Sequence, residues 1–305
     1  MNSIAIRNRA LMNSASISQW FEYESGHAWC ESAYKYQTLP YVAEFANAMT
    51  NLPIIILPLV NIMLLRRYLQ EVNGGLVFPQ LLLTFNGLAS TYYHATLNLF
   101  GQLVDELSLV WMITVFLVVY IPVMKWFPER YAKRLTLIRW IVLIMTAILS
   151  GLCFLEPNLN AVALMLFSIP AAVVINHEGK QSGIPDIESF PCRILALWGV
   201  AFAFWFADRF LCDFWLYLGT PYLHALFHLL AGLAGYTIFI MFSMIDIESR
   251  SKTHRYTAAV RYFPDKSSFI FSFPYISLKE RFHNVALPIF DSNGNQKTAS
   301  DDIQR

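Results

Sequence analysis

The chain has 305 residues, of which 56% are hydrophobic and only 14% are charged. This composition is too apolar for an ordinary soluble domain of this length and indicates a membrane protein. The 22 basic and 21 acidic residues almost cancel, so no strong net field attracts nucleic acid. We infer neither a nucleic-acid partner nor an obligate protein partner, and expect the lipid bilayer to be the surrounding medium.

Seven apolar stretches are each long enough to cross a bilayer, which takes about 20 mostly apolar residues in a helix. They predict an all-α, polytopic membrane protein with a bundle of seven transmembrane helices. Pro53 and Pro58 predict a kink in the first stretch, because proline removes a helical hydrogen bond. In chain order the stretches are 41–65, 76–97, 102–124, 136–155, 158–176, 193–213 and 222–246.

These stretches divide the chain into three expected parts. Residues 1–40 form an N-terminal lumenal segment, residues 41–248 form the transmembrane domain, and residues 249–305 form a C-terminal tail. The tail contains no spanning stretch, and its polar end predicts that it is partly disordered.

Basic residues predict the orientation, because Lys and Arg concentrate in cytosolic loops. Arg66 and Arg67 follow the first stretch, and a basic cluster from Lys125 to Arg134 follows the third. The loops after the second and fourth stretches contain no Lys or Arg. We therefore expect a lumenal or extracellular N-terminus and a cytosolic C-terminus.

Three of the apolar stretches carry unusual polar groups. Ser90 and His94 lie near the end of the second, Asp105 near the start of the third, and His224 and His228 near the start of the seventh. A spacing of four residues places Ser90 and His94 on one helix face, and likewise the other two histidines. The expected topology brings all five to one depth in the outer half of the bilayer, where ionisable groups are costly and indicate function.

A zinc hydrolase site would explain this convergence. Three histidines can bind zinc and leave a fourth position for water, whose pKa zinc lowers to about 7. Asp105 could take and return the proton, and the Ser90 hydroxyl could donate a hydrogen bond to a developing oxyanion. Taken singly, the groups have structural interpretations: histidines bonded to neighbouring helices, an acid that complements a helix dipole, and a small residue that allows close helix packing.

The four cysteines divide between the two sides of the membrane. Cys30, Cys153 and Cys212 fall on the expected outer side, where disulfides form. A bridge between Cys30 and Cys212 is one expectation, with Cys153 as a competing partner. Cys192 falls on the cytosolic side and is expected to stay reduced.

Five short motifs stand out in combination: Trp29-Cys30-Glu31-Ser32, Val42-Ala43-Glu44-Phe45-Ala46-Asn47, Ser90-x3-His94-Ala95-Thr96-Leu97, Gln102-Leu103-Val104-Asp105-Glu106-Leu107 and His224-x3-His228-Leu229-Leu230-Ala231-Gly232. Together they resemble the alkaline ceramidases, which are seven-helix integral membrane amidohydrolases. The similarity covers roughly residues 25–248. It implies hydrolysis of the N-acyl bond of ceramide to a sphingoid base and a free fatty acid, in sphingolipid metabolism at the endoplasmic reticulum or Golgi membrane.

The resemblance also implies roles for single residues. His94, His224 and His228 would hold zinc, Asp105 would activate water, and Ser90 would help to stabilise the oxyanion. It further favours the pairing of Cys30 with Cys212 over the alternative with Cys153.

A lumenal calcium site is a further implication of the resemblance, with the Trp29 carbonyl, Glu31 and Glu44 as ligands. The family pattern has an acidic residue before Trp29 and an Asn two residues after Glu31, where this chain has Ala28 and Ala33. Calcium favours six to eight oxygen ligands. The site is therefore expected to be weak, rearranged or absent, unless Glu24 or the nearby Glu22 substitutes for the missing ligands.

Two other classes of protein stay open. Receptors of the progestin and adiponectin kind resemble ceramidases in zinc ligation but have a cytosolic N-terminus, against which the basic loops argue. A non-catalytic proton-coupled transporter could use buried His and Asp residues as a proton path. Metal content separates the transporter from the hydrolase.

Overall fold

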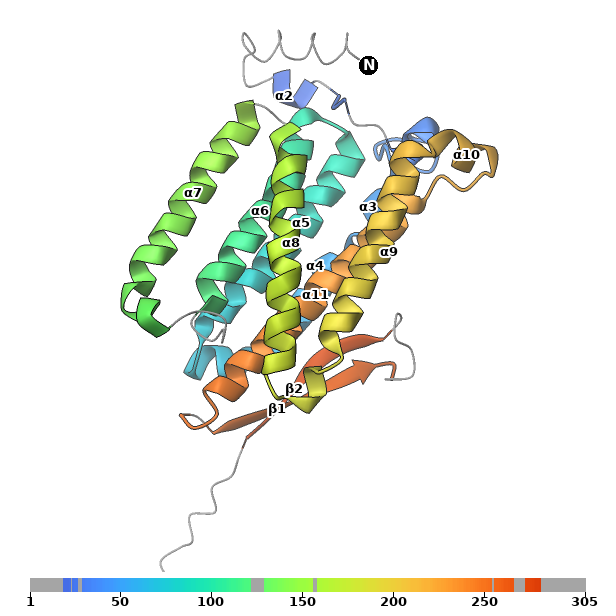
Figure 1. Ribbon diagram of the computed structural model, residues 1–305. Helices are drawn as coiled ribbons and strands as arrows, with labels where there is room; N and C mark the ends of the chain where they lie inside the picture. The colour runs from blue at the N-terminus through green and yellow to red at the C-terminus, as the bar shows by residue number, and fades with distance from the viewer. Residues whose placement is uncertain are drawn as a thin grey trace, which may run out of the picture.

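The computed structural model describes residues 19–22, 24–26, 29–121, 129–155, 158–253, 255–265 and 272–280. Expectations for residues 1–18, for Ala28 and for residues 281–305 lie outside these described residues. Long helices run side by side between two ends, with short segments at one end and a β-hairpin at the other (Figure 1).

Each expected apolar stretch coincides with a helix. The long helices are α4 (Leu52–Glu71), α5 (Val77–Thr96), α6 (Leu99–Tyr120), α7 (Leu135–Leu155), α8 (Asn158–Gln181), α9 (Phe190–Phe210) and α11 (Leu223–Ser249). The shorter ones are α2 (Gln19–Glu22), η1 (Cys30–Tyr34), α3 (Phe45–Met49), η2 (Gly74–Leu76), η4 (Glu129–Arg134), η5 (Pro185–Ile187) and α10 (Cys212–Tyr217). The first stretch is divided between α3 and α4, and Pro53 stands in the first turn of α4, where a missing N–H costs no helical hydrogen bond.

Within the described part of the chain, five segments are long and apolar enough to cross a membrane. They are Phe45–Glu71, Leu99–Tyr120, Leu135–Leu155, Pro185–Phe210 and Leu223–Ser249. This finding is consistent with a multi-pass membrane protein. Helices α5 and α8 stand at the other two expected positions without meeting the same measure, so the number of seven spans stays a prediction.

The helices differ in how deeply they are buried. In the most apolar part of α11, 61% of the residues are buried, against 6% in α7. Helix α11 packs against α9, α4 and α5, whereas α7 contacts mainly α6 and α8 at the edge of the bundle (Figure 1). A helix that is apolar all round belongs in a core or in lipid, and these two helices illustrate both cases.

Two glycines allow α4 to lie close to its neighbours. A Cβ atom at Gly87 of α5 would stand 2.8 Å from a carbon of Ile55, and one at Gly232 of α11 would stand 2.3 Å from a carbon of Ile54. Small residues at these points let helix backbones approach. The close packing holds α3 and α4 between the two helices that carry the histidines.

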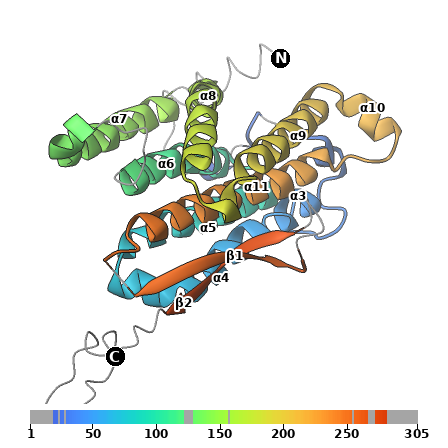
Figure 2. The same cartoon turned by 60° about the horizontal axis from the view of Figure 1, so that its bottom comes forward.

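The expectation of an all-α chain is correct for the bundle and wrong for residues 256–263 and 273–280. Strands β1 (Tyr256–Phe263) and β2 (Phe273–Glu280) form an antiparallel hairpin in which Tyr256 lies opposite Glu280. Figure 2 shows the hairpin beside α4 and α11. An isolated hairpin is marginal in water, and here the Tyr256 ring packs edge-on against Tyr68 of α4 with centroids 6.2 Å apart. Tertiary packing therefore orders a segment that sequence reasoning assigned to the partly disordered tail.

Candidate metal centre

Three histidines from two distant parts of the chain meet in the bundle. His94 comes from the last turn of α5, while His224 and His228 come from the first two turns of α11. Their side chains are at most 5% exposed, and one ring nitrogen from each lies within 4.8 Å of the others. This buried cluster can hold a metal ion.

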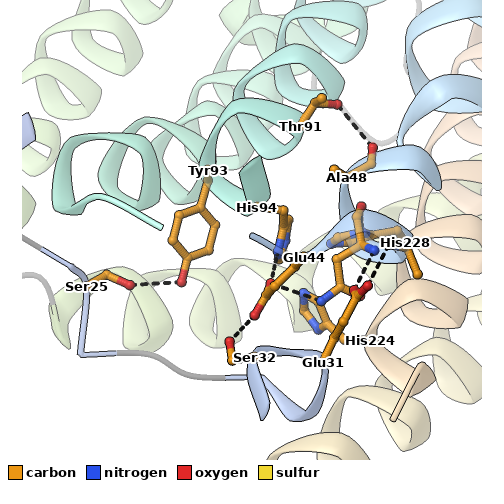
Figure 3. Close-up of polar contacts among 12 residues, drawn as sticks. Ser25, Glu31, Ser32, Glu44, Ala48, Thr91, Tyr93, His94, His224 and His228 are labelled. Carbon is orange, nitrogen blue, oxygen red and sulfur yellow. Dashed lines mark hydrogen bonds and ion pairs between the residues drawn. The ribbon is translucent and has the colours of Figure 1, made fainter. Parts of the chain in front are cut away.

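The hydrogen bonds of these histidines fit that role. His94 Nδ1 donates to Glu44 Oε2 at 2.5 Å, and His228 Nδ1 donates to the Asn47 carbonyl at 3.1 Å (Figure 3). Within the described residues, His94 Nε2 and His224 Nδ1 are buried without a hydrogen-bond partner. Metal-binding histidines typically donate one ring N–H to a carboxylate or carbonyl and offer the other nitrogen to the ion. The donor set suits zinc, which accepts three imidazoles and leaves a further position open.

The turn between α5 and α6 places His94 near Asp105. Leu97 ends α5 in the left-handed region with a φ of 54°, a conformation that costs a side chain about 1 kcal/mol or more. The Asn98 side chain then accepts a hydrogen bond from the Gly101 amide at the start of α6, as an N-cap residue does. Asp105 follows in the second turn of α6.

Asp105 and Ser90 lie together. The Asp105 carboxylate lies near the Ser90 hydroxyl and near His94, so both groups act on its charge. Ser90 is buried and Asp105 is half-buried. The structure thus brings all five of the residues that the sequence singled out into one region at the end of α5 and the starts of α6 and α11.

A second group of contacts fixes η1 against this region. The Trp29 ring stacks on His224 with centroids 3.6 Å apart. Cys30 is joined to Cys212 by a disulfide, with a Cα–Cα distance of 5.3 Å. Asp208 accepts hydrogen bonds from the Cys30 amide at 3.0 Å and from the His224 amide at 3.2 Å. Cys153 is a buried free thiol and Cys192 an exposed one.

The residues expected to bind calcium have other partners. The Trp29 carbonyl accepts a hydrogen bond from the Ser32 amide at 2.9 Å. Glu31 accepts from the amides of Ala46 and Asn47 at 2.6 and 2.8 Å. Burial raises the pKa of the Glu31 carboxyl despite these two bonds, because desolvation penalises its charged form.

Glu44 is held by three side chains. Besides His94, the Ser32 hydroxyl and the Asn47 amide donate to its carboxylate. A carboxylate surrounded by donors is stabilised in its charged form.

Sequence reasoning missed the groups that orient the histidines. From the sequence, neither Asp208 nor Asn47 was assigned a role at the site. Neither has a spacing signal relative to His224 or His228, because the contacts join segments far apart in the chain. Glu44 and Asn47 both lie inside a motif already noted, and that motif was the signal that could have linked them to the site in advance.

The fold and the site define a class: a helical membrane protein with a buried three-histidine cluster beside a carboxylate and a hydroxyl. Comparison with known families is consistent with this class. The model of the ceramidase family matches residues 21–277, and the chain belongs to that family. The resemblance to alkaline ceramidases is thereby confirmed.

Characterised relatives agree. The chain is 90% identical over 270 residues to an alkaline ceramidase of Caenorhabditis briggsae, covering 88% of this chain and 99% of that protein. It is 89% identical over 270 residues to an alkaline ceramidase of Caenorhabditis elegans, with the same two coverages. An alkaline ceramidase of Drosophila melanogaster is 32% identical over 251 residues, covering 82% of this chain and 87% of that protein.

Proposed function

We propose that this protein hydrolyses the N-acyl amide bond of ceramides to a sphingoid base and a free fatty acid, with zinc as its metal. The observation that carries the proposal is the buried cluster of His94, His224 and His228 with Asp105 and Ser90 beside it. Family membership supports the substrate class. It also favours a hydrolase over a lipid-sensing receptor or a proton-coupled transporter.

The three histidines would hold the zinc ion, which supplies Lewis-acid activation of water and of the amide carbonyl when bound. Asp105 acts as the proton carrier: its carboxylate accepts a proton from the attacking water as the new C–O bond forms. It then delivers this proton to the amine nitrogen as the C–N bond breaks. The proton and the acyl group are both accounted for, since water supplies the oxygen and hydrogen that the two products gain.

Ser90 has two successive roles in this scheme. Its hydroxyl lies near Asp105, and by donating to the carboxylate it would orient that group before substrate arrives. When the carbonyl oxygen gains negative charge, the same hydroxyl donates to it and stabilises the tetrahedral oxyanion. The lipid tails of the substrate extend between the apolar helices, and the reaction takes place in the outer half of the bilayer.

We place the N-terminus in the lumen and the C-terminus in the cytosol, at the endoplasmic reticulum or Golgi membrane. The distribution of basic loop residues supports this orientation. A protease-accessibility map of the two termini in sealed vesicles tests it, and a cytosolic N-terminus would instead match the receptor class.

The decisive experiment is an assay of the detergent-solubilised full chain against a panel of ceramides. Fatty acid release should stop after treatment with a zinc chelator and return when zinc is added back. About one zinc per chain is expected by elemental analysis. Unchanged hydrolysis by demonstrably metal-free protein would refute the zinc assignment, and failure with every ceramide would refute the substrate class.

A further inference from the structure

We propose that Glu44 is the positioning residue of the metal ligand His94 in this chain, and that this commitment replaces calcium binding at the neighbouring site. The inference rests on the proposed metal centre and goes beyond it, because the family resemblance assigns Glu44 to calcium. It is argued from the partners of Glu44 and Glu31, from their burial, and from the residues around them.

Glu44 and His94 are joined twice. The Glu44 carboxylate accepts from His94 Nδ1 at 2.5 Å, and the Glu44 amide donates to the His94 carbonyl at 3.0 Å. Both side chains are fully buried. The backbone bond sets the distance between the two residues, and the side-chain bond sets the orientation of the ring and leaves Nε2 without a hydrogen-bond partner (Figure 3).

Hydrogen-bond donors occupy three of the four lone-pair directions of the Glu44 carboxylate. Oε2 accepts from both His94 Nδ1 and the Asn47 amide group, at 2.5 and 3.0 Å, while Oε1 accepts from the Ser32 hydroxyl. A carboxylate oxygen offers two lone-pair directions, and both are filled at Oε2. These N–H and O–H groups direct their positive ends at the carboxylate, so a cation would have to displace them to bind the same lone pairs.

The Glu31 carboxylate also accepts hydrogen bonds from within the protein. Each of its oxygens accepts one backbone amide, from Ala46 and Asn47. The Ala33 side chain contributes no oxygen, and the nearby acid Glu24 is paired with Lys35. These residues do not assemble the shell of six to eight oxygens that calcium prefers. Hydrogen-bond donors within the protein therefore stabilise the two buried carboxylates, and the family's calcium site does not fit the residues present here.

Zinc affinity tests the role of Glu44 without relying on catalysis. We expect Glu44→Ala to weaken zinc binding by about 10- to 100-fold, as loss of a carboxylate behind a metal-binding histidine does, with Glu44→Gln intermediate because its amide oxygen can still accept from Nδ1–H. The dissociation constant is measured on the full chain in detergent by competition with a fluorescent zinc chelator. Glu188→Gln, an exposed glutamate outside the site, is the matched control and should bind zinc like the unmodified chain.

Two results would overturn the role of Glu44. The first is a Glu44→Gln or Glu44→Ala protein that binds zinc as tightly as the control. The second is a variant that unfolds at a lower temperature than the metal-free control, while its folded fraction keeps the zinc dissociation constant of the control. This result would identify a purely structural role for Glu44. Neither readout uses ceramide, so the proposed function can fail while this inference stands.

The calcium part is tested on the unmodified chain. Calcium added after treatment with a calcium chelator should leave both the unfolding temperature and the zinc constant unchanged. A calcium-dependent rise in the unfolding temperature, or saturable binding of radioactive calcium that is lost in Glu31→Gln, would overturn the proposal.

Discussion

The indole ring of Trp29 lies against the imidazole ring of His224, with centroids 3.6 Å apart and planes inclined by 15°. Trp29 is 9% exposed, so the contact is part of the protein interior. It covers one face of the His224 ring and limits its rotation. The N-terminal segment thereby becomes a structural part of the metal centre.

Loss of this stacking should weaken metal binding. Aromatic pairs contribute about 0.5–1.5 kcal/mol beyond their buried area, which corresponds to about a 2- to 13-fold change in a binding constant. We expect Trp29→Ala to weaken zinc binding by about this factor and Trp29→Phe to retain most of the affinity. Equal affinities of the two variants in zinc competition would show that the ring contact does not orient His224.

The histidine cluster should be required for both metal and activity. His94→Ala, His228→Ala and the double variant His224→Ala/His228→Ala are each expected to lose bound zinc and fatty acid release, because the single variants keep two imidazole ligands and the double variant keeps one, fewer than the three that a catalytic zinc site uses. Elemental analysis and a ceramide assay check this. His177→Ala, at the far end of α8, is the control and should keep its zinc. Full activity of the double variant contradicts the assignment.

Substitution of Asp105 should lower the rate of hydrolysis without affecting metal binding. Asp105→Asn keeps the size of the side chain but cannot carry a proton, so hydrolysis should fall by about 100- to 10,000-fold. Zinc content and unfolding temperature should stay close to those of the unmodified chain. The single-turnover rate of fatty acid release is the measurement, and an unimpaired rate would remove Asp105 from the mechanism.

Ser90 should matter less for binding than for turnover. Removing one oxyanion donor lowers kcat by about 100- to 1,000-fold in other hydrolases, and we expect Ser90→Ala to fall in or near this range with little change in KM. Steady-state kinetics over a range of ceramide concentrations separates the two constants. A change confined to KM would indicate that Ser90 only packs against substrate.

The disulfide between Cys30 and Cys212 should stabilise both the folded protein and its histidine cluster. Cys30 and Cys212 are 182 residues apart, and loss of a native disulfide typically costs about 2–5 kcal/mol. Cys30→Ser/Cys212→Ser should unfold at lower temperature and bind zinc more weakly, since Asp208 links Cys30 to His224. Cys192→Ser, at an exposed free thiol, serves as the reference and should match the unmodified chain in both measurements.

Much of the fold could be predicted because its main signals are local. Twenty-residue apolar runs place the helices, and the four-residue spacing of His224 and His228 places both on one face. The hairpin of residues 256–280 escaped prediction because its strands have no spanning hydrophobicity and depend on packing against α4 and α11. The role of Glu44 escaped because the same motif is typical of calcium binding in the resembling family.

The sequence by itself therefore determined the helical bundle, the five polar residues of the site and the family, all of which depend on residue type and spacing along the chain. Only the tertiary structure decided which partners hold these residues: Glu44 behind His94, the Asn47 carbonyl behind His228, and Trp29 and Asp208 against His224. The physical reason is that a hydrogen bond or ring contact depends on separations of a few ångströms between segments up to about 180 residues apart. Such separations are set by the packing of whole helices and leave no periodic pattern in the chain.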